Sequence, residues 1–183
     1  MVVVSKYKKH GGFGLVVLRY LWDMLLGIIT NSAILVPSFA WLAAQVIKTT
    51  VNSVVLKKFA WKRMFGDGGM PSAHSATVTS LAIVVGDACG YGSSIFGLAT
   101  MFAIVVMHDA LGVRRETGKQ AESILTMAEV IKDYVDEPDM DLKTEKLKVL
   151  VGHTPLQVVC GSLLGLVIAL GYIIIFRGFI GLW

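Results

Sequence analysis

Charged side chains are scarce in this sequence of 183 residues, of which Asp, Glu, Lys and Arg together make up 16%. An ordinary water-soluble domain carries about 25% charged residues, so the low value argues against a soluble globular protein. Hydrophobic residues account for 55% of the chain, and its mean hydropathy is +0.68. Disordered chains are poor in apolar residues and rich in charge. The composition therefore excludes disorder as well.

Cysteine is also rare, with only Cys89 and Cys160 in the chain. Two such residues are too few for a disulfide framework, and the sequence has no Cys-x-x-Cys spacing of the kind that binds zinc. Both lie in apolar stretches, which favours a packing role for them. The cysteines therefore point to neither a disulfide framework nor a zinc site.

Long uncharged runs indicate where the chain crosses a membrane. A helix of about 20 apolar residues spans a bilayer. We expect membrane-embedded helices at residues 24–47, 75–88, 91–107 and 156–176. The second of these is short, but a short helix can cross where protein or water covers its ends.

The apolar stretch that begins at Phe13 is interrupted by Arg19 and Asp23, and we interpret it as an interfacial helix that leads into the first span. The predicted fold is therefore all-α: one integral membrane domain over residues 1–183, built as a helical bundle with about four to five membrane-embedded helices.

Residues 109–152 differ from the rest of the chain because they hold most of its acidic side chains. Apolar residues recur there at helical spacing, which predicts an amphipathic helix at 119–135. Topology puts this segment on the same face as the loop at residues 48–73, and the two hold most of the 17 Lys and Arg residues. Such an excess marks the cytoplasmic side. Membrane topology thus accounts for the net charge of +4, and nucleic acid is not needed as a partner to explain it.

Three histidines fall at expected helix ends on this face: His74 opens the second span, His108 closes the third and His153 opens the fourth. Ionisable side chains at a membrane boundary are unfavourable unless they are used, so their convergence predicts a site. Histidine can attack as a nucleophile or carry a proton near neutral pH, while arginine and helix N-termini bind phosphate. These residue types favour phosphoryl transfer. Anchoring of the helices at lipid headgroups is the alternative.

Three segments resemble motifs of a known superfamily. Residues 70–76, Met-Pro-Ser-Ala-His-Ser-Ala, resemble the Pro-Ser-x-His motif of the type 2 phosphatidic acid phosphatases and vanadium-dependent haloperoxidases. Residues 152–161 resemble their His-x-Pro-x-Asp-x-x-x-Gly segment. Residues 108–121, with His-Asp-Ala-Leu-Gly-Val-Arg-Arg and then Gly-Lys-Gln-Ala, are similar to a divergent branch of haloperoxidase-related membrane proteins. The resemblance covers residues 31–165.

The resemblance implies a role for each matching residue. His153 would attack phosphorus and His74 would protonate the leaving oxygen, with no metal ion or other cofactor. Ser72 would help to hold the phosphate oxygens. The implied substrate is a phosphate ester or diphosphate of a lipid or an isoprenoid.

The chain departs from the family pattern at three places. One is Leu147, where the family's last motif has an arginine six residues before the histidine. The family has an acid where this chain has Gln157, and a neutral amide stabilises an imidazolium less than a carboxylate does. Asp109 is a second candidate for the orienting role. The family's upstream basic motif is also missing from this sequence. The remaining candidates for binding phosphate are Lys62, Arg63, Arg114, Arg115 and Lys119.

Two functions therefore stay open. The first is a metal-independent, acid phosphatase-like hydrolase that acts on the cytoplasmic side of a bacterial inner membrane or an organelle membrane. The second is an inactive member of the same fold that binds or moves anionic lipids or serves as a scaffold. Membrane lipids are partners in both, nucleic acid is a partner in neither, and self-association is left open.

Overall fold

The computed structural model describes residues 13–57, 69–134 and 153–180, and over these ranges the chain forms helices and no strand. The helices are α2 (Phe13–Ile29), α3 (Ser32–Leu56), α4 (Ala73–Cys89), α5 (Ser94–Leu111), α6 (Val113–Tyr134) and α7 (Pro155–Ile180). The all-α fold expected from the composition is confirmed.

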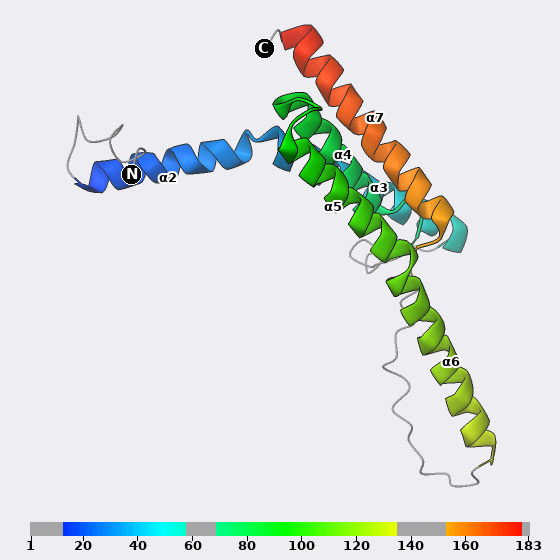
Figure 1. The fold of residues 1–183 in the computed structure, drawn as a ribbon. Helices are drawn as coiled ribbons and strands as arrows, with labels where there is room; N and C mark the ends of the chain where they lie inside the picture. The colour runs from blue at the N-terminus through cyan, green and yellow to red at the C-terminus, as the bar shows by residue number, and fades with distance from the viewer. Residues whose placement is uncertain (1–12, 58–68, 135–152, 181–183) are drawn as a thin grey trace.

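Helix α4 is the centre of the bundle, where it packs against α3, α5 and α7 (Figure 1). Two helices project from this bundle: α2 leads away from the start of α3, and α6 continues the direction of α5 (Figure 1). The C-terminal ends of α3 and α5 and the N-terminal ends of α4 and α7 gather at the same end of the bundle (Figure 1).

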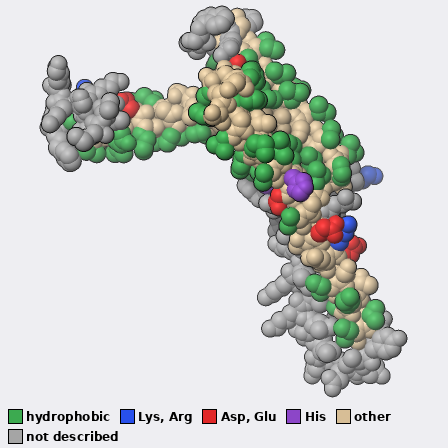
Figure 2. Space-filling view, viewed as in Figure 1, with side chains coloured by type: hydrophobic (Ala, Val, Ile, Leu, Met, Phe, Trp, Pro, Cys, Tyr) green, Lys and Arg blue, Asp and Glu red, His purple; other side chains and the backbone are tan. Residues whose placement is uncertain are grey.

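Small side chains fill the interior and large apolar ones face outward. One buried cluster consists of Ala40, Ala44, Ala73 and Ala76. Large apolar side chains cover much of the visible outer surface, while charged ones gather near the start of α6 (Figure 2). Small residues inside and large ones outside are typical of helices packed in lipid, because lipid solvates large apolar groups as well as a protein core does.

Three helical segments are long and apolar enough to cross a membrane: Ser32–Val54, Ser94–Ala128 and Pro155–Phe176. Helix α4 is apolar but shorter. Its flanks are covered by the three neighbouring helices, so most of its surface contacts protein. A short helix in such surroundings needs little contact with lipid.

Two glycines bring α7 against the start of α4. A Cβ atom on Gly165 would lie 3.0 Å from the Cα of Ala76, and closer still to its carbonyl oxygen. A Cβ on Gly161 would lie 3.1 Å from the carbonyl carbon of Ser72. Both contacts are with backbone, which cannot move aside as a flexible side chain can. The absence of a side chain at these positions therefore sets the distance between the two helices.

The first expected span, residues 24–47, includes parts of two helices. The chain breaks at Asn31, whose side-chain oxygen accepts a hydrogen bond from the Ala33 N–H (2.9 Å) and caps α3. An uncharged run does not reveal such a break, because the capping residue is itself uncharged. Helix α3 extends to Leu56, so Lys48 lies within it instead of in the loop that the run predicts.

The other helices overlap the expected segments and extend beyond most of them. Helices α4 and α7 contain residues 75–88 and 156–176, and α5 begins three residues later than expected, at Ser94. Helix α6 begins six residues before the predicted start at 119. The acidic stretch from residue 135 to residue 152 lies outside the described residues.

We expect Gly165→Ala to lower the free energy of unfolding by about 1–3 kcal/mol, the usual effect of overpacking a core. The new methyl group must displace the backbone of Ala76. Gly171→Ala is the matched control, since it lies on the same helix and its Cβ would meet nothing within 4 Å. Thermal unfolding in detergent measures both. Equal melting temperatures for the two variants would contradict the close contact.

Candidate functional site

Two histidines from separate helices meet at the end of the bundle where α4 and α7 begin. His74 lies in the first turn of α4, and His153 lies two residues before α7. Their ring centroids are 6.1 Å apart, with an angle of 60° between the ring planes. We call these two residues, together with Gln157, the histidine site.

His153 is held from two directions. Its backbone N–H donates a hydrogen bond to the carbonyl oxygen of Ala110, near the end of α5 (3.2 Å). Its ring nitrogen Nδ1 lies 3.0 Å from Oε1 of Gln157, one turn into α7. Only 6% of the residue is exposed. The imidazole is therefore fixed in position by groups from α5 and α7.

Gln157 also determines which ring nitrogen of His153 carries the proton. Its Oε1 accepts a second hydrogen bond, from the backbone N–H of Thr154 (3.2 Å). A backbone N–H can only donate, so the side-chain atom that faces it must be the oxygen. The same oxygen then requires a donor at Nδ1 of His153. In the neutral ring this leaves Nε2 with its lone pair available for reaction.

Ser72 caps the start of α4. Its Oγ accepts hydrogen bonds from the N–H (3.3 Å) and the hydroxyl (3.0 Å) of Ser75, and the residue is fully buried. Its own N–H donates to the carbonyl oxygen of Gln157 (3.0 Å). The structure thus gives Ser72 a capping role and links it to α7. The first N–H groups of a helix have no partner within the helix, so the starts of α4 and α7 favour a bound anion.

The basic residues expected to bind phosphate are not seen to gather at the histidine site. Lys62 and Arg63 lie outside the described residues. Arg114 and Arg115 lie in the first turn of α6, and their side chains are not described. Lys119 is exposed on the projecting helix and forms an ion pair with Glu116 (2.7 Å).

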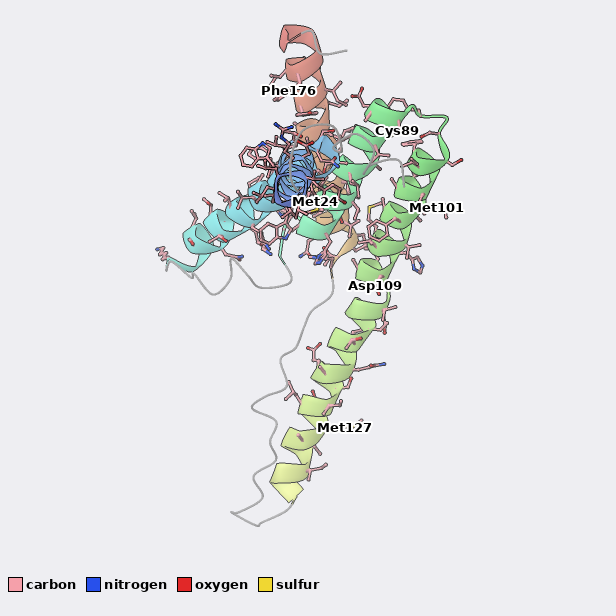
Figure 3. All side chains as sticks on the ribbon, turned by 90° about the vertical axis from the view of Figure 1, so that its left-hand side faces the viewer. Met24, Cys89, Met101, Asp109, Met127 and Phe176 are labelled. Atoms are coloured by element: carbon pink, nitrogen blue, oxygen red, sulfur yellow. The ribbon has the colours of Figure 1, made fainter. Side chains whose placement is uncertain are left out.

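The other two candidates lie near the end of α5. Asp109 is half-buried and precedes Ala110, whose carbonyl oxygen receives the His153 N–H. It therefore lies at the same end of the bundle as the histidine site, where α5 passes into α6 (Figure 3). His108 is exposed and does not share the burial of His153.

Lys48 and Gln45, both on α3, are buried residues that the motifs do not include. Lys48 is 3% exposed and Gln45 is 6% exposed. With Asn52 they recur at helical spacing, which is the sequence signal for one polar stripe on an otherwise apolar helix. An uncharged run that ends at Ile47 hides this signal by placing Lys48 outside the helix.

A bundle of apolar helices with small residues inside and large apolar residues outside, three of its segments long enough to cross a bilayer, defines an integral membrane protein, with one buried and one half-buried imidazole at one end. The chain belongs to the divergent PAP2 family, whose model matches residues 29–168. It is also 38% identical over 149 residues to "Uncharacterized membrane protein YuiD" of Bacillus subtilis (strain 168), covering 78% of this chain and 94% of that protein. No solved structure matches the chain significantly. These matches confirm the resemblance predicted from the three motifs.

We expect Gln157→Leu to abolish the preference of His153 for the tautomer that is protonated at Nδ1. In the wild-type protein at a pH where the ring is neutral, ¹⁵N shifts of labelled histidine should show the proton on Nδ1. In the variant the proton should distribute over both nitrogens, because the acceptor is gone. The exposed His108 supplies the control signal in the same spectrum and should not change. An unchanged His153 signal would mean that Gln157 does not fix the ring.

Proposed function

We propose that this protein is a metal-independent membrane phosphatase that hydrolyses a phosphate ester or diphosphate of a lipid or an isoprenoid. The observation that supports this most is the pairing of His74 and His153, whose ring centroids lie 6.1 Å apart where two helices begin. One imidazole can attack and the other can transfer a proton. Two helix N-termini favour the negative charge of the transferring group.

In the proposed reaction, Nε2 of His153 attacks phosphorus while the bond from phosphorus to the leaving oxygen breaks. His74, in its protonated form, gives its proton to that oxygen. Water then attacks the phosphohistidine, neutral His74 accepts a proton from the water, and inorganic phosphate leaves. Positioning and electrostatic stabilisation are the main demands of phosphoryl transfer, and both can come from groups at this end of the bundle.

Gln157 favours a second candidate function, the binding of anionic lipid headgroups without turnover. An amide holds the tautomer of His153, but it does not stabilise the positive ring as a carboxylate does. The two functions share one site and differ in whether a covalent intermediate forms.

We expect purified protein to release phosphate from at least one member of a panel of lipid phosphates and isoprenoid phosphates or diphosphates. His153→Ala should reduce release to background, because no nucleophile remains. His74→Ala should slow release by at least about 100-fold, the lower range for loss of an acid–base group. His108→Ala, an exposed histidine on α5, is the matched control and should retain the wild-type rate.

Two outcomes decide between the functions. If the wild type and His153→Ala release phosphate at the same rate across the panel, hydrolysis at this site is excluded. Retention of anionic lipid vesicles by the wild-type protein, without turnover, would then favour headgroup binding.

We also propose that the histidine site faces the cytoplasm. The end of the bundle at which it lies continues into α6 (Figure 1), and residues 48–73 and 109–152, which the sequence places next to the helix ends gathered there, hold most of the Lys and Arg residues. Loops and ends rich in these residues stay on the cytoplasmic side.

Thiol labelling in bacterial cells tests this orientation. Cys89 is exposed at the opposite end of the α4–α5 pair (Figure 3). In a Cys160→Ser background, a membrane-impermeant maleimide should label Cys89 in intact cells. A Ser123→Cys change on α6, made with Cys89→Ser in the same background, should be labelled only after the membrane is permeabilised. The reverse pattern would place the histidine site outside.

A further inference from the structure

Helix α6 exposes a row of large apolar side chains outside the bundle. The helix leaves the end of α5 and runs on in the same direction, away from the other helices (Figure 1). Val113, Ile124, Met127 and Ile131 are each between 44% and 64% exposed, and Met127 lies well out on the projecting part (Figure 3). Apolar side chains that gather on one exposed face mark an interaction surface.

The spacing of these residues is that of a coiled coil. We call the row the α6 seam; it consists of Val113, Thr117, Gln120, Ile124, Met127, Ile131 and Tyr134. Its members are alternately four and three residues apart, and this heptad pattern keeps one narrow line of side chains facing a partner helix. The helix has 22 residues, which is room for three heptads. That is about the shortest length over which the pattern indicates a coiled coil.

The charged residues of α6 all lie outside the seam. Four of them are basic and four are acidic, so the charges of the helix sum to zero. The positions that flank the seam carry only Arg114 and Glu116, which have opposite signs, so two copies joined along the seam meet no row of like charges. A helix without net charge gains little attraction to an anionic lipid surface. The charge pattern therefore favours a helical partner over the membrane surface.

The membrane determines how a second copy presents the same seam. Copies inserted with one orientation are related by a two-fold axis perpendicular to the bilayer, so their α6 helices run parallel. Thr117, Ile124 and Ile131 then occupy the seam positions at which β-branched side chains favour two strands. The two Gln120 side chains face each other, and a polar pair inside such a seam restricts the register at some cost in stability.

We infer that α6 is a dimerisation helix, and that two copies of this protein in one membrane join through the α6 seam as a parallel, two-stranded coiled coil. The inference goes beyond the proposed function and does not depend on it, because the seam includes no residue of the histidine site. A seam of this length with two polar positions is weak in free solution. Confinement to one membrane raises the effective concentration of the partner helix and offsets that weakness.

The first test is cross-linking of the full-length protein in isolated membranes, in a background with Cys89→Ser and Cys160→Ser. With a short, membrane-permeant bis-maleimide, Ile124→Cys and Ile131→Cys should each give covalent dimers. Both positions meet their own counterparts only when the helices are parallel and in register. Glu122→Cys is the matched control, because residues two apart in a helix face different directions, and it should stay monomeric on the gel.

The second test is the molar mass of the protein purified in detergent. The wild type should have twice the 19.8 kDa of one chain. Ile124→Asp combined with Ile131→Asp should give monomers, because the dimer would bury unpaired charges. Thr126→Asp adds the same charge outside the seam and should remain dimeric. Gln120→Leu should shift the equilibrium toward the dimer, since it replaces the polar pair with an apolar one.

The two tests have opposite outcomes for the two possible partners of α6. Cross-linking at Ile124 and Ile131 but not at Glu122, with dissociation of the double Asp variant, supports the inference. Equal cross-linking at Glu122 and Ile124, or a wild type that is monomeric in membranes and in detergent, overturns it. A monomer in which Ile124→Cys is protected from a water-soluble maleimide overturns it too and assigns the seam to the lipid surface.

Phosphate release, measured separately, keeps this inference distinct from the proposed function. A dimer that hydrolyses no substrate leaves the dimerisation helix in place and counts against the hydrolase. A monomer that hydrolyses lipid phosphates in a His153-dependent way leaves the proposed function in place and overturns the dimerisation helix.

Discussion

The close approach of α7 to α4 is the constraint on which the rest of the site depends. Gly161 lies against the backbone of Ser72, and this contact is possible only without a side chain. At that separation the N–H of Ser72, the capping residue of α4, donates a hydrogen bond to the carbonyl oxygen of Gln157 (3.0 Å). This bond links the first turn of α7 to the start of α4. The side chain of the same Gln157 then meets His153. The orientation of the buried imidazole is therefore a consequence of helix packing, transmitted through one residue.

The lipid surroundings explain why small residues form the contacts between these helices. Lipid tails solvate large apolar side chains as well as neighbouring helices do, so association depends on close backbone packing and on hydrogen bonds between helices. The interior of this bundle is accordingly built mostly from alanine, valine, glycine and serine, and most of its larger apolar side chains face outward. A bundle packed in this way brings several helix ends close together. Buried polar groups at those ends bond to one another, as Ser72 and Ser75 do.

The sequence predicts the features that follow from composition and from local motifs. Uncharged runs locate the apolar helices, and the motifs around Ser72 and His153 identify two of the segments that meet. The break at Asn31 is not predictable in this way, because it depends on one capping hydrogen bond inside an uncharged run. Lys48 is buried because α3 continues past the end of the uncharged run, to Leu56, and packs against α4. The hydrogen bond from the Thr154 backbone to Gln157 is a matter of three-dimensional geometry, although the spacing of His153 and Gln157 allows it.

Gln157 stands where the family has an acid, and this difference changes how well the site would bind an anion relative to how well it would react with it. An amide oxygen preserves the hydrogen-bond pattern that fixes the His153 ring, since it accepts from the ring and from the Thr154 N–H. It adds no negative charge, so a nearby anion meets less repulsion than it would beside a carboxylate. The same neutrality removes stabilisation from the positively charged ring that develops during attack. In the function that we propose, this chemistry favours tight retention of phosphate with slow turnover.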